Sequence, residues 1–328
     1  MYRMIVAADQ RNPFPPPPRS RLRLIARGYL PEDCQLYDLG RWPLEHYVSA
    51  MAREVALARI QQRYNVCLHN KYLFQVMMQS TTQRVAKAFG LITRGTSLDF
   101  ASDEPIADAK AWLRDLVAAH GKVVVKPVAG HAGEGVRILA TAADAESVTI
   151  GEAGVMVMHF VEQHAYARAI FPDATNTLRV LVMRDDDGPF LATAVQRVGT
   201  SASAPIDSFR SGGMSVGIDA ASGQLLRGVR QPKRSGGALV WLERHPDTDA
   251  AITGVELPGW HALVAELLAI MERLPFLSYV GWDVVITDDG FTIIEGNHNS
   301  GVALLQIHGP LLVDERVKAF YRRYGLRA

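Results

Sequence analysis

The segment GWDVVITDDGFTIIEGN, residues 281–297, constrains the fold of this chain more than any other. Two runs rich in β-branched residues flank a DDG turn, and glycine at the end of so short a connection is typical of a three-residue hairpin loop. Such a loop makes Thr287 face Phe291, and it therefore places Asp283 directly opposite Glu295. A two-residue loop would instead send the two acids to opposite faces of the hairpin.

Strand alternation also places Asn297 on the face of the two acids. The same face is predicted to carry Val285, Phe291 and Ile293. The predicted core face consists of Val284, Ile286, Thr292 and Ile294. Adjacent carboxylates repel unless they share a proton or a cation. Asp283, Glu295 and Asn297 together offer the all-oxygen ligands that Mg²⁺ prefers. A polar pair at a solvent-facing sheet edge is the alternative interpretation.

A second segment, VKPVAGHAGEGVRIL at residues 125–139, places Lys126 at the end of a β-branched run and before a glycine-rich loop. The loop contains Gly130, Gly133 and Gly135, and it is longer than a plain hairpin needs. Its N–H groups and the lysine could surround phosphate oxygens. The spacing matches neither the P-loop nor the dinucleotide-binding turn. A solvated lysine beside a flexible loop is the alternative.

Composition limits the class of protein. A chain of 328 residues is near the size at which one core divides into two or three lobes. The net charge of +1 gives no global field that would recruit nucleic acid or an anionic membrane. Two cysteines are too few for a disulfide framework. The sequence contains no run of 18 apolar residues, so it predicts no membrane span. We therefore expect a soluble, cytoplasmic protein with no nucleic-acid partner and no membrane span; its oligomeric state stays open.

Periodicity predicts both helices and strands. Near the N-terminus we expect a stiff proline-rich segment at 13–20, a short strand at 34–39 and a long amphipathic helix at 43–65. A further helix is predicted at 70–80, with Asn70 as its N-cap. Another is predicted within 105–121, where it ends at Gly121. From residue 122 on, short strands alternate with helical patterns, which predicts an α+β fold. The stretch from 199 to 232 is rich in Gly, Ser and Ala and is interpreted as an active-site or surface loop.

Five segments, taken in order, resemble the ATP-grasp superfamily: NKYLFQVMM, VVVKPVAGHAGEGVRIL, VMVMHFVEQH, NTLRVLVM and GWDVVITDDGFTIIEGN. The blocks TNTLRV, QRVG and SGGMSVGID are most similar to the sugar-transfer-associated ATP-grasp family. The resemblance runs from about residue 70 to residue 301. It implies an α+β ATP-grasp fold in which two α+β lobes hold ATP between them. It also implies an N-terminal region at 1–69, a nucleotide lobe with a glycine-rich lid at 70–160, and a lobe with the metal site and acceptor pocket at 161–328.

The resemblance also implies roles for individual residues in binding ATP. Lys71 would contact the α-phosphate and Lys126 would reach phosphate from its strand. The loop from Gly130 to Gly135 would close over the β- and γ-phosphates; within it His131 is either a γ-phosphate contact or an incidental loop residue. The adenine edge would meet the backbone of a four-residue hinge, namely Met158, His159, Phe160 and Val161. Either Glu162 or His164 would hold the ribose hydroxyls.

For the chemistry, the resemblance implies that Asp283, Glu295 and Asn297 form the metal set, with Mg²⁺ as the ion and Mn²⁺ as an alternative. Arg179 resembles the arginine that stabilises the transferring phosphoryl group, and Arg197 would do the same or bind a substrate carboxylate. Four further residues match the family blocks as acceptor-site or loop-shaping positions: Asn176, Asp207, Gly212 and Gly213. The segment EGNHNSG departs from the proline-glycine that is commoner in relatives, which puts the shape of the substrate floor in doubt.

The implied activity is that of an ATP-dependent carboxylate–amine ligase that works through an acyl-phosphate. Its small-molecule substrates would be sugar- or amino-acid-derived, in a setting such as polysaccharide biosynthesis. Two alternatives stay open at this point. A phosphotransferase on the same fold would stop after phosphoryl transfer, and a non-catalytic nucleotide-binding module would not turn over at all.

Overall fold

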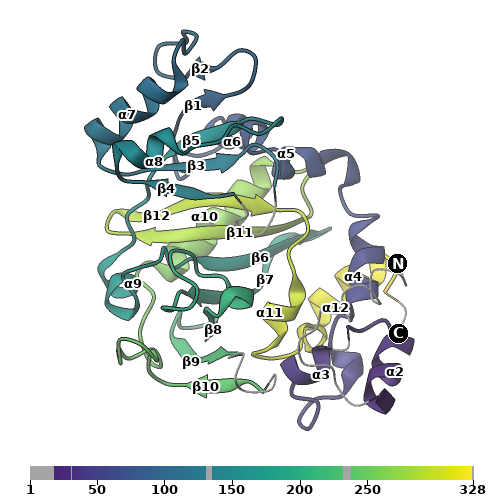
Figure 1. Cartoon of the computed structure of the whole chain (residues 1–328). Coiled ribbons are helices and arrows are strands. Elements are labelled where there is room, and N and C mark those ends of the chain that lie inside the picture. The colour runs from purple at the N-terminus through teal and green to yellow at the C-terminus, as the bar shows by residue number, and fades with distance from the viewer. Residues whose placement is uncertain (1–17, 31, 131–134, 232–237, 327–328) are drawn as a thin grey trace.

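The computed structural model describes residues 18–30, 32–130, 135–231 and 238–326. Two antiparallel β-sheets dominate the molecule, one with five strands and one with seven. Figure 1 shows the five-stranded sheet with its helices at one end and the seven-stranded sheet in the middle. The mixture of antiparallel sheets and covering helices confirms the predicted α+β class.

The five-stranded sheet has the strand order β2-β1-β5-β3-β4. Its strands are β1 (Ala88–Ile92), β2 (Leu98–Asp99), β3 (Val123–Pro127), β4 (Arg137–Leu139) and β5 (Val155–His159). The helices of this lobe are α6 (Lys71–Gln79), α7 (Ala109–His120) and α8 (Ala142–Glu146). As predicted, Asn70 is the N-cap of α6: its side chain accepts hydrogen bonds from the amides of Tyr72 and Leu73. Helix α7 ends at Gly121, whose φ of 73° suits glycine.

The seven-stranded sheet has the order β10-β9-β8-β7-β6-β11-β12. Its strands are β6 (Leu178–Asp185), β7 (Gly188–Val198), β8 (Met214–Ile218), β9 (Leu225–Arg230), β10 (Val240–Leu242), β11 (Tyr279–Thr287) and β12 (Gly290–Asn297). Its helical elements are α9 (Ala165–Ile170), η3 (Phe209–Ser211), α10 (Trp260–Arg273), α11 (Val302–Gln306), η5 (Leu311–Val313) and α12 (Glu315–Arg323).

The prediction of a loop from 199 to 232 is partly wrong, because β8 and β9 lie within it. Its glycines serve close packing in a sheet rather than flexibility. A Cβ on Gly217 would lie 2.9 Å from the His308 ring, and one on Gly228 would lie 2.6 Å from the Met214 side chain. Small residues therefore allow neighbouring strands and side chains to approach closely here.

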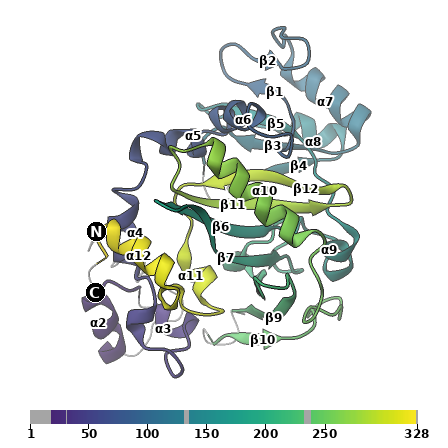
Figure 2. The ribbon, with the colours of Figure 1, turned by 180° about the vertical axis from the view of Figure 1, so that it is seen from behind.

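Helices cover both faces of the seven-stranded sheet. Helix α10 crosses one face, as Figure 2 shows, and packs there on a core that includes Val180, Trp282 and Val284. The other face is apolar at one end, where Leu181 and Tyr279 pack against α4, α11 and α12. Because side chains alternate along each strand, the remainder of this second face carries polar side chains of β6 and β11.

The N-terminal part differs most from its prediction. It contains α2 (Pro18–Ala26), α3 (Asp33–Leu36), η1 (Leu44–His46), α4 (Ala50–Leu57), η2 (Gln62–Tyr64) and α5 (Asn65–His69). The strand predicted at 34–39 is wrong, since helix α3 extends to Leu36, and the helix predicted at 43–65 consists of several short helices. Ser49 caps α4 with its side chain, which begins a new helix after Tyr47. Gln61 has a φ of 40°, which interrupts the helix before η2.

The two sheets are joined directly. Val85 forms a parallel β-bridge with Ile293 of β12. The amide of Ala86 donates to the Ile293 carbonyl at 2.9 Å, and the Ile293 amide donates to the Arg84 carbonyl at 2.7 Å. A small apolar cluster that includes Met156, Met158 and Ile294 fills the space between the lobes. Among the described residues, no helix is both long enough and apolar enough to cross a bilayer.

Candidate functional site

The acid pair lies on β11 and β12, in the predicted register. Asp283 pairs with Glu295, and Gly281 pairs with Asn297, so the three predicted metal ligands share a face. The predicted hairpin loop is wrong, however, because Thr287 pairs with Gly290 and only two residues form the loop.

A β-bulge restores the pairing that the short loop would have destroyed. The register shifts between Asp283 and Val284, so that Ile294 is the extra residue on β12. On β12 the faces predicted before the bulge are consequently wrong: Phe291 and Ile293, predicted on the acid face, belong to the α10 core. On β11 the prediction that Val284 and Ile286 face the core is correct. Thr292, predicted in the core, pairs with Val285 on the acid face, and Ile294 lies in the cluster between the lobes.

Two arginines hold Asp283. The Arg179 guanidinium donates to both carboxylate oxygens, and Arg197 Nη2 donates to Oδ2 at 3.0 Å. Strand pairing explains this: Asp283 lies opposite Arg179 of β6, and Arg197 lies on β7, which pairs with the other edge of β6. Burial by itself would raise the pKa of Asp283, but the two positive charges outweigh burial and hold this pKa below its usual value. Asp283 is therefore ionised and fully engaged.

Arg197 is shared between two acids. Its Nε lies 3.4 Å from Asp207 Oδ2 and donates to the Thr177 hydroxyl at 2.9 Å. Burial works against its charge, but Asp207, Asp283 and Glu295 together hold the pKa of Arg197 above its ordinary value. Arg197 is therefore a fixed cation beside the acid pair, held by Asp207 and Asp283.

Two lysines approach Glu295 from the five-stranded lobe. Lys71, at the start of α6, lies with its Nζ 3.9 Å from Glu295 Oε1 and 3.3 Å from the Gly130 carbonyl, to which it donates. Lys126 of β3 donates to the Ile294 carbonyl at 3.1 Å. Burial lowers the pKa of Lys126 to about 8; Glu295 opposes this shift and Lys71 adds to it. Glu295 is thus the acid that faces the lysines.

The oxygen donors fit a divalent cation in part. In the described part of the chain Glu295 has no hydrogen bond as close as those on Asp283, and its nearest cation, Lys71, lies at 3.9 Å. Asn297 uses its amide nitrogen on the Gly281 carbonyl at 3.2 Å, which leaves the amide oxygen available. Asp283 must release at least one arginine before it can ligate. Within the described residues, no group of three or more His, Cys, Asp or Glu is arranged around a metal. The site therefore suits Mg²⁺ that takes much of its coordination from phosphate or water oxygens.

The predicted hinge follows β5. Met158 is buried in the cluster between the lobes, and Val161 packs at its margin. The backbone N–H groups of Phe160, Val161 and Glu162 have no hydrogen-bond partner in the part of the chain that the structure describes. Such donors would be satisfied by water or by the edge of a flat heterocycle.

His159 belongs to this hinge, but its groups are already engaged. Its amide donates to the Lys87 carbonyl at 2.9 Å. Its ring stacks on Phe89, with 3.7 Å between ring centroids, and it meets His120 edge-on. The His159 side chain therefore lies with α7 and β1 rather than with the two lysines.

Of the two ribose candidates, one is committed elsewhere. His164 is the N-cap of α9: its Nδ1 accepts from the Tyr166 amide at 3.1 Å, and its Nε2 lies 3.9 Å from Asp288. Glu162 is exposed and makes no such contact with another residue that the structure describes. The capping role leaves Glu162 as the better candidate.

The predicted lid is described only at its two ends. Gly130 contacts Lys71 as given above, and Gly135 adopts a φ of 74° close to Pro127. His131 and Gly133 lie outside the described residues. The backbone conformation at this position therefore requires glycine: a side chain would be strained at this φ, and its Cβ would lie 2.8 Å from the Pro127 ring.

The family-block residues divide into two groups. Asn176 is buried and accepts from the Gly199 amide at 2.9 Å, while its own amide donates to carbonyls at the end of α9. Gly212, with a φ of 108°, and Gly213, where a Cβ would lie 3.0 Å or less from three carbonyls, shape the turn before β8. Asp207, in contrast, belongs to the arginine cluster.

Sequence reasoning missed three participants. Thr177 accepts from Arg197 and donates to the Asp207 carboxylate. Thr177 directly precedes β6 and lies two residues before Arg179, which was a usable signal because residues i and i+2 of an extended segment share a face. Ser300 accepts from Arg179 at 3.4 Å, and the Ile294 carbonyl accepts from Lys126. Neither contact carries a sequence signal.

Comparison with known proteins agrees with this arrangement. The chain belongs to the family described as sugar-transfer associated ATP-grasp, whose sequence model matches residues 146–320, more than half of the chain. No curated protein matches the chain by sequence comparison.

Solved structures resemble the chain more distantly. N5-carboxyaminoimidazole ribonucleotide synthetase from Thermotoga maritima is 14% identical, with a TM-score of 0.39 over 70% of this chain and 41% of that one. A RimK domain ATP-grasp protein from Sphaerobacter thermophilus is 16% identical, with a TM-score of 0.41 over 76% and 67%. D-alanyl-alanine synthetase A from Vibrio cholerae is 10% identical, with a TM-score of 0.46 over 78% and 66%. The chain thus spans from two fifths to two thirds of the length of these proteins, and likeness at this distance transfers no activity.

Proposed function

We propose that this protein is an ATP- and Mg²⁺-dependent carboxylate–amine ligase. The observation that carries the proposal is the acid pair: Glu295 faces Lys71 and Lys126, while its neighbour Asp283 is held by two arginines. Four cations and two carboxylates meet where two lobes join. A polyphosphate with a divalent cation has the charge and the oxygen atoms that such a place requires.

Lys71 and Lys126 would oppose the phosphates. Both lysines are removed from bulk water, and Glu295 is the acid nearest to them among the described residues, so an anionic ligand would add to the negative charge that they face. The free amides after His159 would meet the base, and Glu162 the ribose. The segment between Gly130 and Gly135 would cover the β- and γ-phosphates.

Glu295 and Asn297 would hold Mg²⁺, joined by Asp283 once it gives up a hydrogen bond to arginine. When bound, the ion supplies neutralisation of phosphate oxygens and orients the γ-phosphoryl group. Mn²⁺ offers a similar coordination and is the alternative ion.

Arg179 and Arg197 would act on the transferring group. Because Asp283 already fixes both guanidinium groups, little reorganisation is needed when negative charge develops beside them. In the proposed reaction the γ-phosphoryl group passes from ATP to a carboxylate oxygen of the substrate and leaves ADP. An amine then attacks the acyl-phosphate carbon, inorganic phosphate departs, and the amine loses a proton as the C–N bond forms.

The family description supports a substrate derived from a sugar, either a carboxylated sugar or an amino sugar, with an amino acid as the other partner. We further propose the division into an N-terminal region at 1–69, a nucleotide lobe at 70–160 and a metal and acceptor lobe at 161–328. In this division the acceptor pocket lies near the arginines, and the reaction takes place in the cytoplasm.

The test is ADP release from the purified chain with a panel of sugar acids and amino acids, assayed with and without added amines. A ligase gives ADP and phosphate in equal amounts only when carboxylate and amine are both present, and mass spectrometry finds the amide. ADP formation with one substrate alone, and a phosphorylated product, would identify a phosphotransferase instead. ATP binding with no ADP across the panel would indicate a non-catalytic nucleotide-binding module.

A further inference from the structure

The two arginines beside Asp283 differ in what else holds them. Arg179 makes its close contacts with Asp283, and its other partner among the described residues is the Ser300 hydroxyl, 3.4 Å from Nη1. Arg197 has a second set of partners. Its Nε and its Nη2 both donate to the Thr177 hydroxyl, at 2.9 and 2.5 Å, and only Nη2 also donates to Asp283. Arg197 is therefore anchored independently of Asp283.

The Thr177 hydroxyl is itself fixed by Asp207. It donates to Asp207 Oδ2 at 2.5 Å, and the Thr177 amide donates to the same oxygen at 2.9 Å. The Arg197 amide donates to the Thr177 carbonyl at 2.7 Å, so the backbone of the threonine is held as well. A hydroxyl has a single proton to donate, and Thr177 gives it to the carboxylate, which leaves the hydroxyl oxygen to accept from Arg197.

The acid in this chain of contacts is buried. Asp207 is 8% exposed, and it lies in the connection between β7 and β8. Burying a carboxylate is costly unless hydrogen bonds and an opposite charge compensate, and here Thr177 and Arg197 supply both. The charge of Asp207 therefore acts on the arginine and on the threonine that accepts from it.

One nitrogen of Arg197 is left for a ligand. No described residue accepts a hydrogen bond from Nη1, and this atom is not fully buried. Nη1 shares a carbon atom with Nη2, which contacts Asp283, so it lies at the acid pair. A guanidinium donor that is fixed in advance stabilises developing negative charge with little reorganisation.

We propose that Thr177 and Asp207 are positioning residues, which hold the Arg197 guanidinium so that Nη1 is directed at the transferring phosphoryl group. This rests on the proposed function, in which Arg197 acts on that group. Because the anchor does not involve Asp283, Arg197 keeps its orientation when Asp283 gives up a hydrogen bond to arginine. Arg179 has no comparable anchor among the described residues.

The probe is MgADP with tetrafluoroaluminate, a mimic of the phosphoryl group in transfer, and calorimetry compares its affinity with that of MgADP alone. The ratio of the two affinities reports contacts to the transferring group and needs no turnover. Thr177→Val keeps the shape of the side chain and removes the hydroxyl. It should lower the ratio about tenfold or more and change the affinity for MgADP less than about twofold. Thr177→Ser keeps the hydroxyl and should stay within about threefold of the wild-type ratio.

Two further variants test whether the effect passes through the arginine. Asp207→Asn removes the charge that holds the threonine and should lower the ratio about fivefold or more. Arg197→Lys gives the full size of the effect. Thr177→Val added to Arg197→Lys should lower the ratio no further, since residues that act through one group are not additive.

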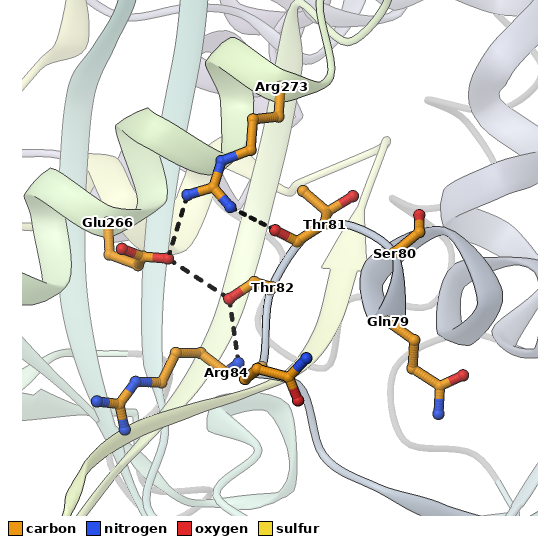
Figure 3. Close-up of a pocket in the computed structure, with 8 residues that line it drawn as sticks. Gln79, Ser80, Thr81, Thr82, Arg84, Glu266 and Arg273 are labelled. Carbon is orange, nitrogen blue, oxygen red and sulfur yellow. Dashed lines mark hydrogen bonds and ion pairs between the residues drawn. The ribbon is translucent and has the colours of Figure 1, made fainter.

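Thr82→Val is the matched control for the loss of a buried hydroxyl. Thr82 is 7% exposed, and Figure 3 shows its hydroxyl between the Arg84 amide, which donates to it at 3.0 Å, and Glu266, 3.5 Å away. Neither partner belongs to the arginine cluster. Melting curves should show a folded but less stable protein for both valine variants, whereas the ratio should fall only in Thr177→Val.

The proposal is overturned if Thr177→Val keeps the wild-type ratio, or if Thr177→Ser loses as much as Thr177→Val. It is also overturned if the wild type binds the tetrafluoroaluminate complex no more tightly than MgADP. If Thr177→Val does not fold, Asp207→Asn decides by the same criterion. A chain that passes this test but forms no amide with any substrate pair would refute the proposed ligase activity and leave the positioning of Arg197 standing.

Discussion

Asp283 and Glu295 face each other across two paired strands, yet their surroundings differ. The Asp283 side chain is 7% exposed and both its oxygens accept from arginines. The Glu295 side chain is 27% exposed, and its cation is Lys71 at 3.9 Å. One acid is a buried counter-ion, and the other is more exposed and lies farther from its cation. Equal position in a hairpin therefore does not give equal roles.

The difference follows from the place of each strand in the sheet. Strand β11 is internal, so Asp283 has β6 beside it and the two arginines within reach. Strand β12 is the last strand of the sheet, so Glu295 has only the other lobe beyond it. The lysines that approach Glu295 come from that lobe.

The largest effect should come from removing the charge of the buried acid. Asp283→Asn leaves Arg179 without its ion pair in a buried place, and we expect a loss of about 3 kcal/mol or more in the free energy of unfolding. Urea denaturation measures it. Asp185→Asn is the control, since the partly exposed pair of Asp185 with Arg316 should contribute about 1 kcal/mol or less. Equal losses in the two variants would contradict the distinction.

At Glu295 we expect a large loss of activity and a small change in stability. Glu295→Gln should reduce the rate of ADP formation about 100- to 1,000-fold, because a metal-holding carboxylate is lost. Its free energy of unfolding should change by less than about 1 kcal/mol. Coupled ADP assays and urea melts measure the two quantities. Glu272→Gln, at an exposed ion pair, serves as control and should change neither. Wild-type turnover in Glu295→Gln would remove this residue from the metal site.

The smallest effect concerns pH. Burial holds the pKa of Lys126 at about 8, so the lysine loses its charge as pH rises through that value. Bound phosphate favours the charged form and raises the pKa, so ATP binding takes up a proton in this range. Affinity for ATP should therefore fall up to about tenfold from pH 7 to pH 9.

Calorimetry in two buffers of different ionisation enthalpy measures both the affinity and the proton uptake. In Lys126→Met the affinity should be lower at pH 7 and should vary less with pH. A Lys126→Met variant that shows the full wild-type decline between pH 7 and pH 9 would assign the titration to another group.

Much of the site could be read from the sequence, but for reasons that were only partly right. The pairing of Asp283 with Glu295 was predicted from a three-residue loop that does not exist. The structure reaches the same pairing through a two-residue loop and a bulge at Ile294. A bulge leaves no mark in the alternation of so apolar a strand, so the errors at Phe291 and Thr292 were unavoidable from sequence alone.

What the sequence by itself determined was local: the capped start of α6, the end of α7, the strand runs, and the motifs that identify the family. These depend on side-chain chemistry and periodicity within a few residues. Only the tertiary structure decided that two arginines pair with Asp283 and that two lysines lie near Glu295. Contacts between residues about one hundred or more positions apart, such as Arg179 with Asp283, depend on strand order, which no local pattern contains.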